Sequence, residues 1–253
     1  PLVTPAPNEI TARAYILYNP RTRMIVAGEN DKLKFAPAST TKIMTALVSL
    51  DHYSPDDVIV ARNMSSVVGS KMNLIEGEAI TVRNVLYGLM LPSGNDAAKV
   101  LAQNYPGGEK AFVEAMNTKA KELYMNDTIF IDPAGLDDHN SSTAYDLARL
   151  GNEALENELL SQIVKTQSTI VYNTASTSAY PLKNLNELLY DPNVIGVKTG
   201  FTDEAGGVLV TGYSINGEKY LVVVLKTDNR FYDTQQILYG IIPGIKQTTF
   251  SSQ

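Results

Sequence analysis

Cysteine is absent from the 253 residues, which excludes disulfide bonds, thiolate catalysis and zinc sites built from thiolate ligands. Histidine is scarce: only His52 and His139 are present, and no His-Glu-x-x-His motif occurs, so we expect no histidine-rich zinc peptidase. The Gly-x-Ser-x-Gly motif is missing as well, which argues against an α/β-hydrolase. The sequence therefore predicts a protein that works without a metal ion or a cofactor.

Long apolar runs and clusters of basic residues are also lacking. The longest aliphatic stretch near a predicted strand is Leu221 to Leu225, far shorter than a membrane-spanning segment. A net charge of −6 without a Lys/Arg cluster argues against nucleic-acid binding. The first residue is Pro1 rather than Met, so we expect secretion through a removed signal peptide, and membrane association only through segments absent from this chain.

What the chain does contain is three short motifs in a fixed order. They are Ser39-Thr40-Thr41-Lys42, Ser93-Gly94-Asn95 and Lys198-Thr199-Gly200, which read as S-x-x-K, S-x-N and K-T-G. Each is weak evidence alone, since S-x-x-K is expected by chance about once in 250 residues. Their context strengthens the signal, because an apolar helical stretch (43–50) follows the first motif, a predicted helix (96–104) follows the second, and a β-rich run (194–197) precedes the third.

The first motif has the composition of an activated nucleophile. A serine hydroxyl reacts poorly until a base removes its proton. A helix places positions i and i+3 on one face, so Lys42 can reach the Ser39 hydroxyl. To act as the base, Lys42 must be neutral part of the time, and lowering its pKa by roughly 3 units costs about 4 kcal/mol. Burial and a second cation, for which Lys198 is the candidate, could supply that shift; the alternative is a solvated helix lysine.

The other two motifs offer groups that relay protons and hold a substrate. Ser93 supplies a hydroxyl and Asn95 an amide for a substrate carbonyl. Alternatively, either residue simply caps the following helix. Lys198 and Thr199 offer a charge and a hydroxyl for a carboxylate, and Gly200 allows close backbone approach. The alternative for the third motif is a glycine-containing turn.

Strand patterns lie at both ends of the chain. Short β-rich runs at 12–18 and 24–28 predict one hairpin, and Asn216-Gly217 between runs at 207–213 and 219–226 predicts another. A further strand is expected at 168–172, and helices are expected at 109–124, at 145–155 after a capping box that starts at Thr143, and at 230–239.

We therefore predict an α+β fold: an antiparallel sheet from the N- and C-terminal segments, with packed helices and an inserted helical lobe. The sheet lobe would comprise about residues 1–60 and 166–253, and the helical lobe about residues 61–165. This arrangement would bring the three motifs to a cleft between the lobes.

Beyond the motifs, the chain closely resembles the low-molecular-mass penicillin-binding proteins, which are serine-type D-alanyl-D-alanine carboxypeptidases. The resemblance spans nearly the whole chain, and four segments carry it: 88–98, 132–137 (Asp-Pro-Ala-Gly-Leu-Asp), 196–202 and 228–231 (Asp-Asn-Arg-Phe). It implies the fold of serine β-lactamases and penicillin-binding proteins in a single transpeptidase-like catalytic domain (1–253). It also implies an extracytoplasmic location in the cell envelope.

The resemblance implies a catalytic role for four residues. Ser39 would form an acyl-enzyme with the penultimate residue of a peptidoglycan stem peptide ending in D-Ala-D-Ala, and release the terminal D-alanine. Lys42 would be the general base, Ser93 would pass the proton to the leaving amine, and Asn95 would bind the substrate backbone. β-Lactam antibiotics are expected to acylate the same serine.

It also implies where the substrate binds. The backbone N–H groups of Ser39 and Phe201 would form an oxyanion hole. Thr199 and Arg230 would hold the terminal carboxylate, beside the charge of Lys198. Gly200 would keep this strand close to the nucleophile.

Two other functions remain as alternatives. A class A-like β-lactamase needs a glutamate for deacylation, and the segment 153–157 superficially offers Glu-x-x-x-Asn. Its spacing from Ser93 is long for that pattern, and Gly94 stands where Asp is expected. The other alternative is a non-catalytic penicillin-binding sensor or cell-wall-binding module. Transpeptidation would differ from carboxypeptidation only in the acceptor, an amine instead of water.

Overall fold

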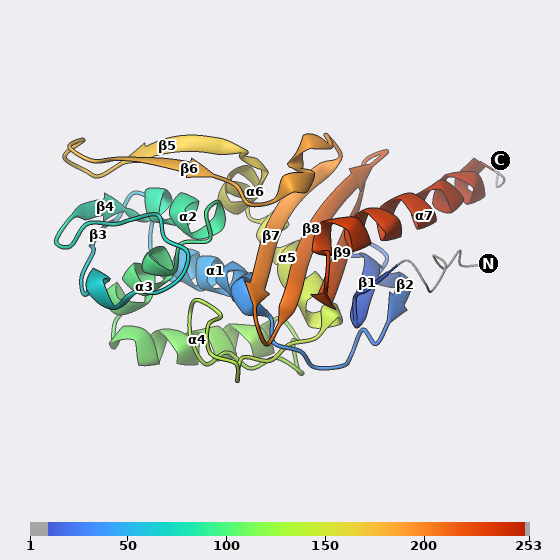
Figure 1. The fold of residues 1–253 in the computed structure, drawn as a ribbon, viewed down its shortest axis with the longest axis horizontal. Coiled ribbons are helices and arrows are strands. Elements are labelled where there is room, and N and C mark those ends of the chain that lie inside the picture. The colour runs from blue at the N-terminus through green and yellow to red at the C-terminus, as the bar shows by residue number, and fades with distance from the viewer. Residues whose placement is uncertain (1–9, 251–253) are drawn as a thin grey trace.

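The main sheet has five antiparallel strands in the order β2-β1-β9-β8-β7, so segments from both ends of the chain pair as predicted. The computed structural model describes residues 10–250, with side chains up to residue 240. The strands of this sheet are β1 (Ala14–Asn19), β2 (Met24–Glu29), β7 (Val194–Thr202), β8 (Gly206–Ile215) and β9 (Glu218–Thr227). The α+β class is thereby confirmed (Figure 1).

Helices and two small hairpins complete the fold. The helices are α1 (Lys42–His52), α2 (Val82–Met90), α3 (Asn95–Asn104), α4 (Gly108–Glu122), α5 (Ala144–Glu156), α6 (Glu158–Lys165) and α7 (Arg230–Phe250), with short 3-10 helices η1 (Ala38–Thr41), η2 (Met64–Ser66) and η3 (Glu187–Tyr190). The hairpins are β3 (Val58–Val60) with β4 (Ala79–Thr81), and β5 (Ser168–Tyr172) with β6 (Ala179–Lys183). Among the described residues, no helix combines the length and the apolar character needed to cross a membrane.

Helices cover both faces of the main sheet, so its central strands are apolar almost throughout. Along β9, Leu221, Val223 and Leu225 face the core shared with α5. The intervening Val222 and Val224 face the core shared with α7 on the other side (Figure 1). Because successive side chains in a strand point to opposite faces, a strand buried on both sides reads as a continuous apolar run.

The helical region is built around α1. Helices α2, α3 and α4 pack against α1, and the β5–β6 hairpin lies over α2 (Figure 1). Residues 42–49 of α1 are all buried, which carries Lys42 into the interior. Helices α5 and α6 contact the sheet, although both fall within the predicted helical lobe of 61–165. The lobe boundaries stay a proposal, and their outer limits, 1 and 253, lie outside the described residues.

Local signals in the sequence explain several element boundaries. Asn216 and Gly217 both adopt positive φ, as the tight β8–β9 turn requires. Thr143 caps α5 by accepting the N–H of Asp146 at 3.0 Å. The capping box is only half formed, because the Asp146 carboxylate binds the N–H of Asp127 and the hydroxyl of Thr128 instead of returning to Thr143.

Asn157 joins α5 to α6. It ends the first helix, and its Oδ1 accepts the N–H of Leu160 at 3.0 Å to cap the second. The asparagine of the Glu-x-x-x-Asn pattern is therefore a helix cap. We expect Asn157→Ala to lower the free energy of unfolding by about 1 kcal/mol, and the melting temperature by roughly 2–4 °C.

Asn157→Ser is the matched control, because it keeps a side-chain oxygen that can accept the same N–H. Urea and thermal unfolding of both variants measure the difference. Equal losses of stability in the two variants would show that the side-chain cap is not the source.

Candidate active site

Ser39 and Lys42 meet at the start of α1. Ser39 lies in the 3-10 turn η1 and not on the α-helix itself, which begins at Lys42, one residue before the predicted stretch of 43–50. The Lys42 Nζ lies 2.9 Å from Ser39 Oγ and 2.6 Å from the Ala134 carbonyl oxygen. The amine is therefore held between the hydroxyl it was predicted to reach and a backbone acceptor from a distant loop.

The turn that carries Ser39 is fixed by its neighbours. Thr40 Oγ1 donates to the Pro37 carbonyl at 2.6 Å, and Ala38 adopts a positive φ of 47°. Gly135 packs directly on the turn: a Cβ at that position would lie 1.9 Å from the Ala38 carbonyl oxygen. With its own φ at +78°, position 135 admits only glycine, and this explains part of the Asp-Pro-Ala-Gly-Leu-Asp segment.

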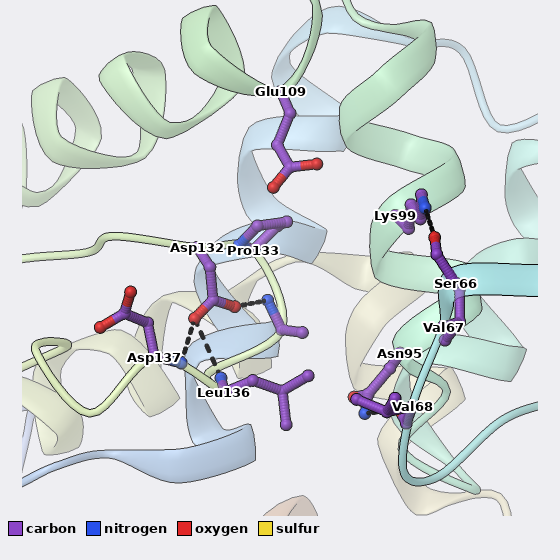
Figure 2. A pocket seen from close by; sticks show the side chains of 11 residues that line it. Ser66, Val67, Val68, Asn95, Lys99, Glu109, Asp132, Pro133, Leu136 and Asp137 are labelled. Atoms are coloured by element: carbon purple, nitrogen blue, oxygen red, sulfur yellow. Dashed lines mark hydrogen bonds between the residues drawn. The ribbon is translucent and has the colours of Figure 1, made fainter. Parts of the chain in front are cut away.

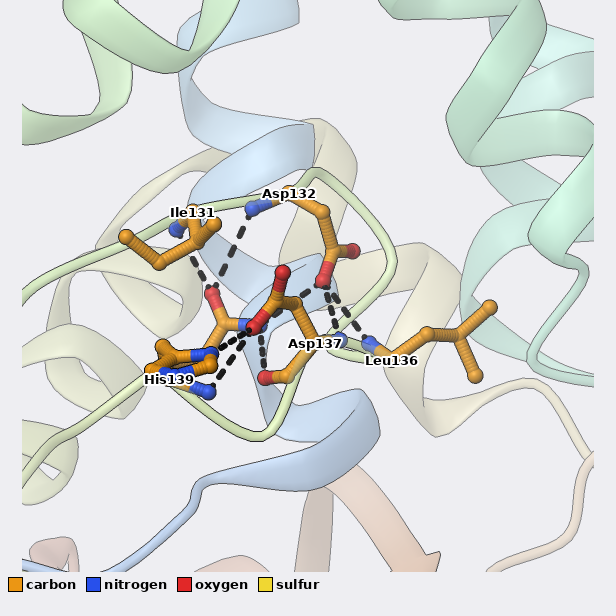
Figure 3. Close-up of polar contacts among 6 residues, drawn as sticks. Ile131, Asp132, Leu136, Asp137 and His139 are labelled. Carbon is orange, nitrogen blue, oxygen red and sulfur yellow. Dashed lines mark hydrogen bonds and ion pairs between the residues drawn. The ribbon is translucent and has the colours of Figure 1, made fainter.

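The Asp132 carboxylate organises the loop that supplies the Ala134 carbonyl (Figure 3). It accepts hydrogen bonds of 2.6–3.0 Å from four successive backbone N–H groups and from one side-chain amide, those of Ala134, Gly135, Leu136, Asp137 and Asn140 Nδ2. Asp132 is half-buried, and these donors pair with both oxygens of its carboxylate. The loop is thus held in one shape, with the Ala134 carbonyl aimed at Lys42.

Burial controls the protonation of the two lysines in the site. Lys42 is fully buried, and the loss of solvent lowers the pKa of its amine to about 7, against the opposing effect of the Asp132 and Asp96 carboxylates. Burial also lowers the pKa of Lys198 well below its usual value, and the charges of Lys42 and Arg230 lower it further. Because repulsion is mutual, protonation of either amine disfavours protonation of the other. Burial is what lowers the pKa of Lys42, so the contribution that the sequence reasoning assigned to Lys198 stays a prediction.

Ser93 and Asn95 do not cap α3. The N-cap is Gly94, which makes no side-chain cap bond. Ser93 adopts a positive φ of 64°, and its buried Oγ has no hydrogen-bond partner among the described residues. Asn95 Nδ2 donates to the Val68 carbonyl at 2.8 Å, while its Oδ1 is buried without a partner in the described part of the chain. The capping alternative is wrong for both residues, and two polar atoms are left free for a ligand.

The Asp96 carboxylate holds the loop beside this motif. It accepts N–H groups of Met72, Asn73, Leu74 and Ala97 at 2.8–3.0 Å. Asn95 donates its own N–H to the Ser70 carbonyl at 2.8 Å. The loop that contacts Asn95 is therefore tied to the first turn of α3.

The third motif lies within β7, which continues to Thr202 beyond the β-rich run of 194–197. Lys198 and Thr199 are buried, and Lys198 Nζ donates to the Thr199 carbonyl at 3.0 Å. A Cβ on Gly200 would lie 3.1 Å from the Ser39 backbone nitrogen, so the glycine brings β7 against the turn of the nucleophile. The turn alternative is wrong. Phe201, next in the strand, is 61% exposed.

Arg230 reaches this strand from the first turn of α7. Its Nη1 donates to the Gly200 carbonyl at 3.2 Å, and its buried Nε has no partner among the described residues. Partial burial lowers the pKa of Arg230 from its usual value. The guanidinium thus has donor capacity left beside Lys198 and Thr199.

A cavity of about 420 Å³ adjoins Asn95 (Figure 2). Its walls come from the η2 loop, α3, the start of α4 and the Asp132 loop, and the lining residues are Ser66, Val67, Val68, Asn95, Lys99, Glu109, Asp132, Pro133, Ala134, Leu136 and Asp137. Of these, the sequence reasoning singled out only Asn95 and the segment 132–137. Within residues 10–240, no group of three or more His, Asp or Glu side chains is placed to hold a metal ion.

Comparisons with known proteins show the family of the chain. A family model described as D-alanyl-D-alanine carboxypeptidase matches residues 2–229. The chain belongs to this family. A D-alanyl-D-alanine endopeptidase from Pseudomonas aeruginosa is 37% identical over 90% of the chain and 75% of its own length. The D-alanyl-D-alanine carboxypeptidase DacF of Bacillus subtilis is 34% identical over 84% of the chain, which spans 57% of that relative.

Solved structures of family members share the fold. The Streptomyces K15 DD-transpeptidase superposes with a TM-score of 0.85 at 32% identity, covering 92% of this chain and 96% of that one. A D-alanyl-D-alanine carboxypeptidase from Mycobacterium tuberculosis gives a TM-score of 0.86 at 29% identity, covering 93% and 92%. The penicillin-binding-protein fold predicted from the resemblance is confirmed.

The position of Lys42 makes its titration measurable. We expect the Lys42 amine to carry its proton below a pH of about 7 and to lose it as the pH rises through that value, since burial disfavours the charged form. NMR of ¹³Cε-labelled lysines follows the titration, and Lys42→Met identifies the resonance by removing it. A Lys42 titration near the ordinary lysine value of about 10.4 would contradict the buried geometry.

Proposed function

We propose that this member of the D-alanyl-D-alanine carboxypeptidase family removes the terminal D-alanine from peptidoglycan stem peptides, with Ser39 as the nucleophile. The observation that carries the proposal is the Lys42 amine, fully buried, with a pKa lowered to about 7 and 2.9 Å from Ser39 Oγ. A serine and a neutral amine at this distance form a nucleophile and its general base.

The reaction proceeds through an acyl-enzyme. Ser39 Oγ attacks the carbonyl carbon of the penultimate D-alanine as Lys42 takes the hydroxyl proton. The C–N bond of the tetrahedral intermediate then breaks, and the leaving D-alanine amine receives a proton relayed by Ser93. Water hydrolyses the ester, which returns Ser39 to its starting state. The unpartnered Ser93 Oγ supports this relay role.

The backbone N–H groups of Ser39 and Phe201 stabilise the oxyanion of the tetrahedral intermediate. Two features support this assignment: Gly200 brings β7 against the Ser39 nitrogen, and the Ser39 turn is fixed from the other side by Gly135. Donors held in place before the reaction stabilise the developing charge without reorganising, and losing one such donor typically costs about 3 kcal/mol.

The substrate is held at both ends of the reacting bond. Lys198, Thr199 and Arg230 bind the terminal carboxylate, and the free donors of the guanidinium support this role. Asn95 binds the peptide backbone of the acyl part, for which its unpartnered Oδ1 is available. The same groups bind β-lactams, whose acylation of Ser39 follows from the same chemistry. We further propose that the enzyme acts outside the cytoplasm, where peptidoglycan lies.

In this fold, the candidate glutamate of the class A-like β-lactamase alternative does not line the cavity beside Asn95. Glu153 lines a pocket with Tyr18 and Arg149 that shares no residue with the cavity beside Asn95, and Asn157 is a helix cap.

A second candidate function is cleavage of a D-alanyl bond within a cross-linked peptide, because the Pseudomonas relative is named an endopeptidase and is 37% identical. It would use the same acylation step with a different leaving group.

Replacing the nucleophile tests the central assignment. We expect Ser39→Ala to lose both the covalent adduct with benzylpenicillin and the release of D-alanine from Nα,Nε-diacetyl-Lys-D-Ala-D-Ala, since Ser39 Oγ is the hydroxyl that is hydrogen-bonded to the Lys42 base. Intact-protein mass spectrometry over time follows the adduct, and a D-alanine assay follows turnover.

Persistent labelling of Ser39→Ala would reject Ser39 as the nucleophile. For the unmodified enzyme, rapid clearance of the drug would indicate a β-lactamase, and an adduct without any D-alanine release would indicate a sensor. A cross-linked dimer peptide cleaved faster than the monomer would favour the endopeptidase.

Arg230 should determine recognition of the terminal carboxylate. We expect the enzyme to prefer a D-Ala-D-Ala acid over the matching C-terminal amide, and Arg230→Ala to reduce that preference roughly 10- to 100-fold, the range for one charge-assisted hydrogen bond. The ratio of kcat/KM for the two peptides measures it. Arg230→Lys is the control, because it keeps the charge without the planar fork. An unchanged ratio in Arg230→Ala would mean that the carboxylate is bound elsewhere.

A further inference from the structure

We infer that Asp233 is a positioning residue for substrate recognition. Its buried carboxylate ties the first turn of α7 to the end of β9 and to Thr11, and thereby orients the Arg230 guanidinium toward the terminal carboxylate of the peptide. The inference rests on the proposed function, because it takes Arg230 to bind that carboxylate. Neither Asp233 nor Thr11 belongs to one of the three motifs.

The Asp233 carboxylate is 0% exposed and binds a part of the chain that is 222 residues away in the sequence. It accepts the Thr11 N–H at 3.1 Å, the Thr11 hydroxyl at 2.8 Å and the hydroxyl of Thr227. A buried carboxylate is costly unless such donors surround it. An aspartate that served only the dipole of α7 could stay in water. The hydrogen bonds of Asp233 therefore indicate a tertiary role, which is to hold three segments together.

The chain that leads into α7 departs from regular strand geometry. The pairing of β8 with β9 shifts register between Gly207 and Leu209, and Lys226 near this shift adopts a positive φ of 49°. Irregularities of this kind redirect side chains beside active sites, and they persist only where the surroundings hold them. The next residue is Thr227, whose hydroxyl binds Asp233. The carboxylate thus holds the point from which the chain turns toward Arg230.

The same hydroxyl groups fix the connection between β9 and α7. Thr227 Oγ1 accepts the N–H of Asn229 at 3.1 Å, and Thr11 Oγ1 accepts the N–H of Asp228 at 3.0 Å. Both residues directly before Arg230 are therefore bonded to the two hydroxyls that donate to Asp233. Because positions i and i+3 of a helix lie on one side, Asp233 holds the helical turn that begins at Arg230.

Arg230 depends on this support, because its side chain has few other restraints. Its Nη1 donates to the Gly200 carbonyl at 3.2 Å, its buried Nε has no partner, and no carboxylate forms an ion pair with it among the described residues. A Cβ on Gly207 would lie 2.7 Å from the Thr227 carbonyl oxygen and 3.5 Å from the Arg230 Cβ, so the turn packs closely on β8. A guanidinium binds a carboxylate best when its planar fork is oriented beforehand.

Asp233→Asn tests the inference, because it removes the charge and keeps the size of the side chain. We expect the preference for a D-Ala-D-Ala acid over the matching C-terminal amide to fall about three- to tenfold, since a small displacement of a substrate-binding group is enough to weaken its contact. The ratio of kcat/KM for the two peptides measures it. Loss of stability alone would lower turnover of both peptides equally and leave this ratio unchanged.

A double variant shows whether the effect passes through Arg230. In the Arg230→Ala background, Asp233→Asn should not change the ratio further, because no guanidinium is left to position. A further loss of preference in the double variant would overturn the inference, since it would mean that Asp233 acts on the carboxylate by another route.

Asp146→Asn is the matched control. Asp146 is also a buried aspartate in the first turn of a helix, and it also accepts a backbone N–H and a threonine hydroxyl, those of Asp127 and Thr128. Its helix, α5, carries none of the groups assigned to the substrate. Asp146→Asn should lower the melting temperature and keep the full preference for the acid.

Thr11 provides a second variant in case Asp233→Asn does not fold. Thr11→Val keeps the shape of the side chain and removes the hydroxyl that binds Asp233 and Asp228. It should reduce the preference less than Asp233→Asn, because the Thr11 N–H still binds the carboxylate. Thr11→Ser keeps the hydroxyl and should retain the original ratio.

The outcomes separate the inference from the proposed function. An unchanged ratio in Asp233→Asn or, where that variant does not fold, in Thr11→Val overturns the inference while the proposed function stands. An equal loss of preference in Asp146→Asn overturns it too, because it reduces the effect to general destabilisation. Failure of the unmodified enzyme to release D-alanine from the acid peptide overturns the proposed function instead.

Discussion

The site depends on one constraint: the Lys42 amine is kept out of water. Desolvation is what lowers its pKa to about 7, and the same burial fixes its position between Ser39 Oγ and the Ala134 carbonyl. A lysine on a solvated helix would be protonated at neutral pH and free to move. Burial therefore both lowers the pKa of the Lys42 amine and fixes its position. Helix α1, buried along residues 42–49, is the element that buries it.

Two aspartates oppose the lowering of the Lys42 pKa by burial. Asp132 and Asp96 each bind a series of backbone N–H groups, and each shapes a loop that reaches the site. Their negative charges also raise the pKa of Lys42, against the effect of burial. The same two side chains thus hold the loops in shape and raise the pKa of Lys42. With a pKa of about 7, the amine can both accept and return a proton. Without them, desolvation alone would hold Lys42 neutral and make it a weaker base.

The sequence predicted what depends on local pattern. The Ser39–Lys42 pair follows from spacing on a helix, and the β8–β9 hairpin follows from Asn216-Gly217. The antiparallel sheet from both chain ends follows from the strand patterns there, whereas the strand order β2-β1-β9-β8-β7 comes from the structure alone. Features that depend on tertiary contact were missed. Helix α2 and strand β6 were not predicted, and β7 continues through Lys198 because its far end pairs with β8.

The lining of the cavity beside Asn95 could not be predicted from sequence patterns either. The cavity beside Asn95 joins residues from segments that are far apart in the sequence, and single polar residues such as Lys99 and Glu109 carry no pattern that marks them. The positive φ of Ser93 was equally hidden, since a serine gives no sign of it. The 132–137 segment was recognised by resemblance, yet the reason for its glycine, the 1.9 Å approach to Ala38, needs coordinates.

The active site gathers features that disfavour folding. Two buried amines repel each other, Ala38 and Ser93 adopt strained backbone conformations, and the Ser93 and Asn95 oxygens lack partners among the described residues. Such features persist only where the surroundings over-determine them. Here the surroundings are a sheet covered on both faces and two loops held by carboxylates, the buried Asp96 and the half-buried Asp132. Substrate would relieve part of this cost, because a terminal carboxylate neutralises the excess positive charge and a peptide backbone pairs with the free amide oxygen. The proposed substrate would therefore gain affinity from the same groups that disfavour folding.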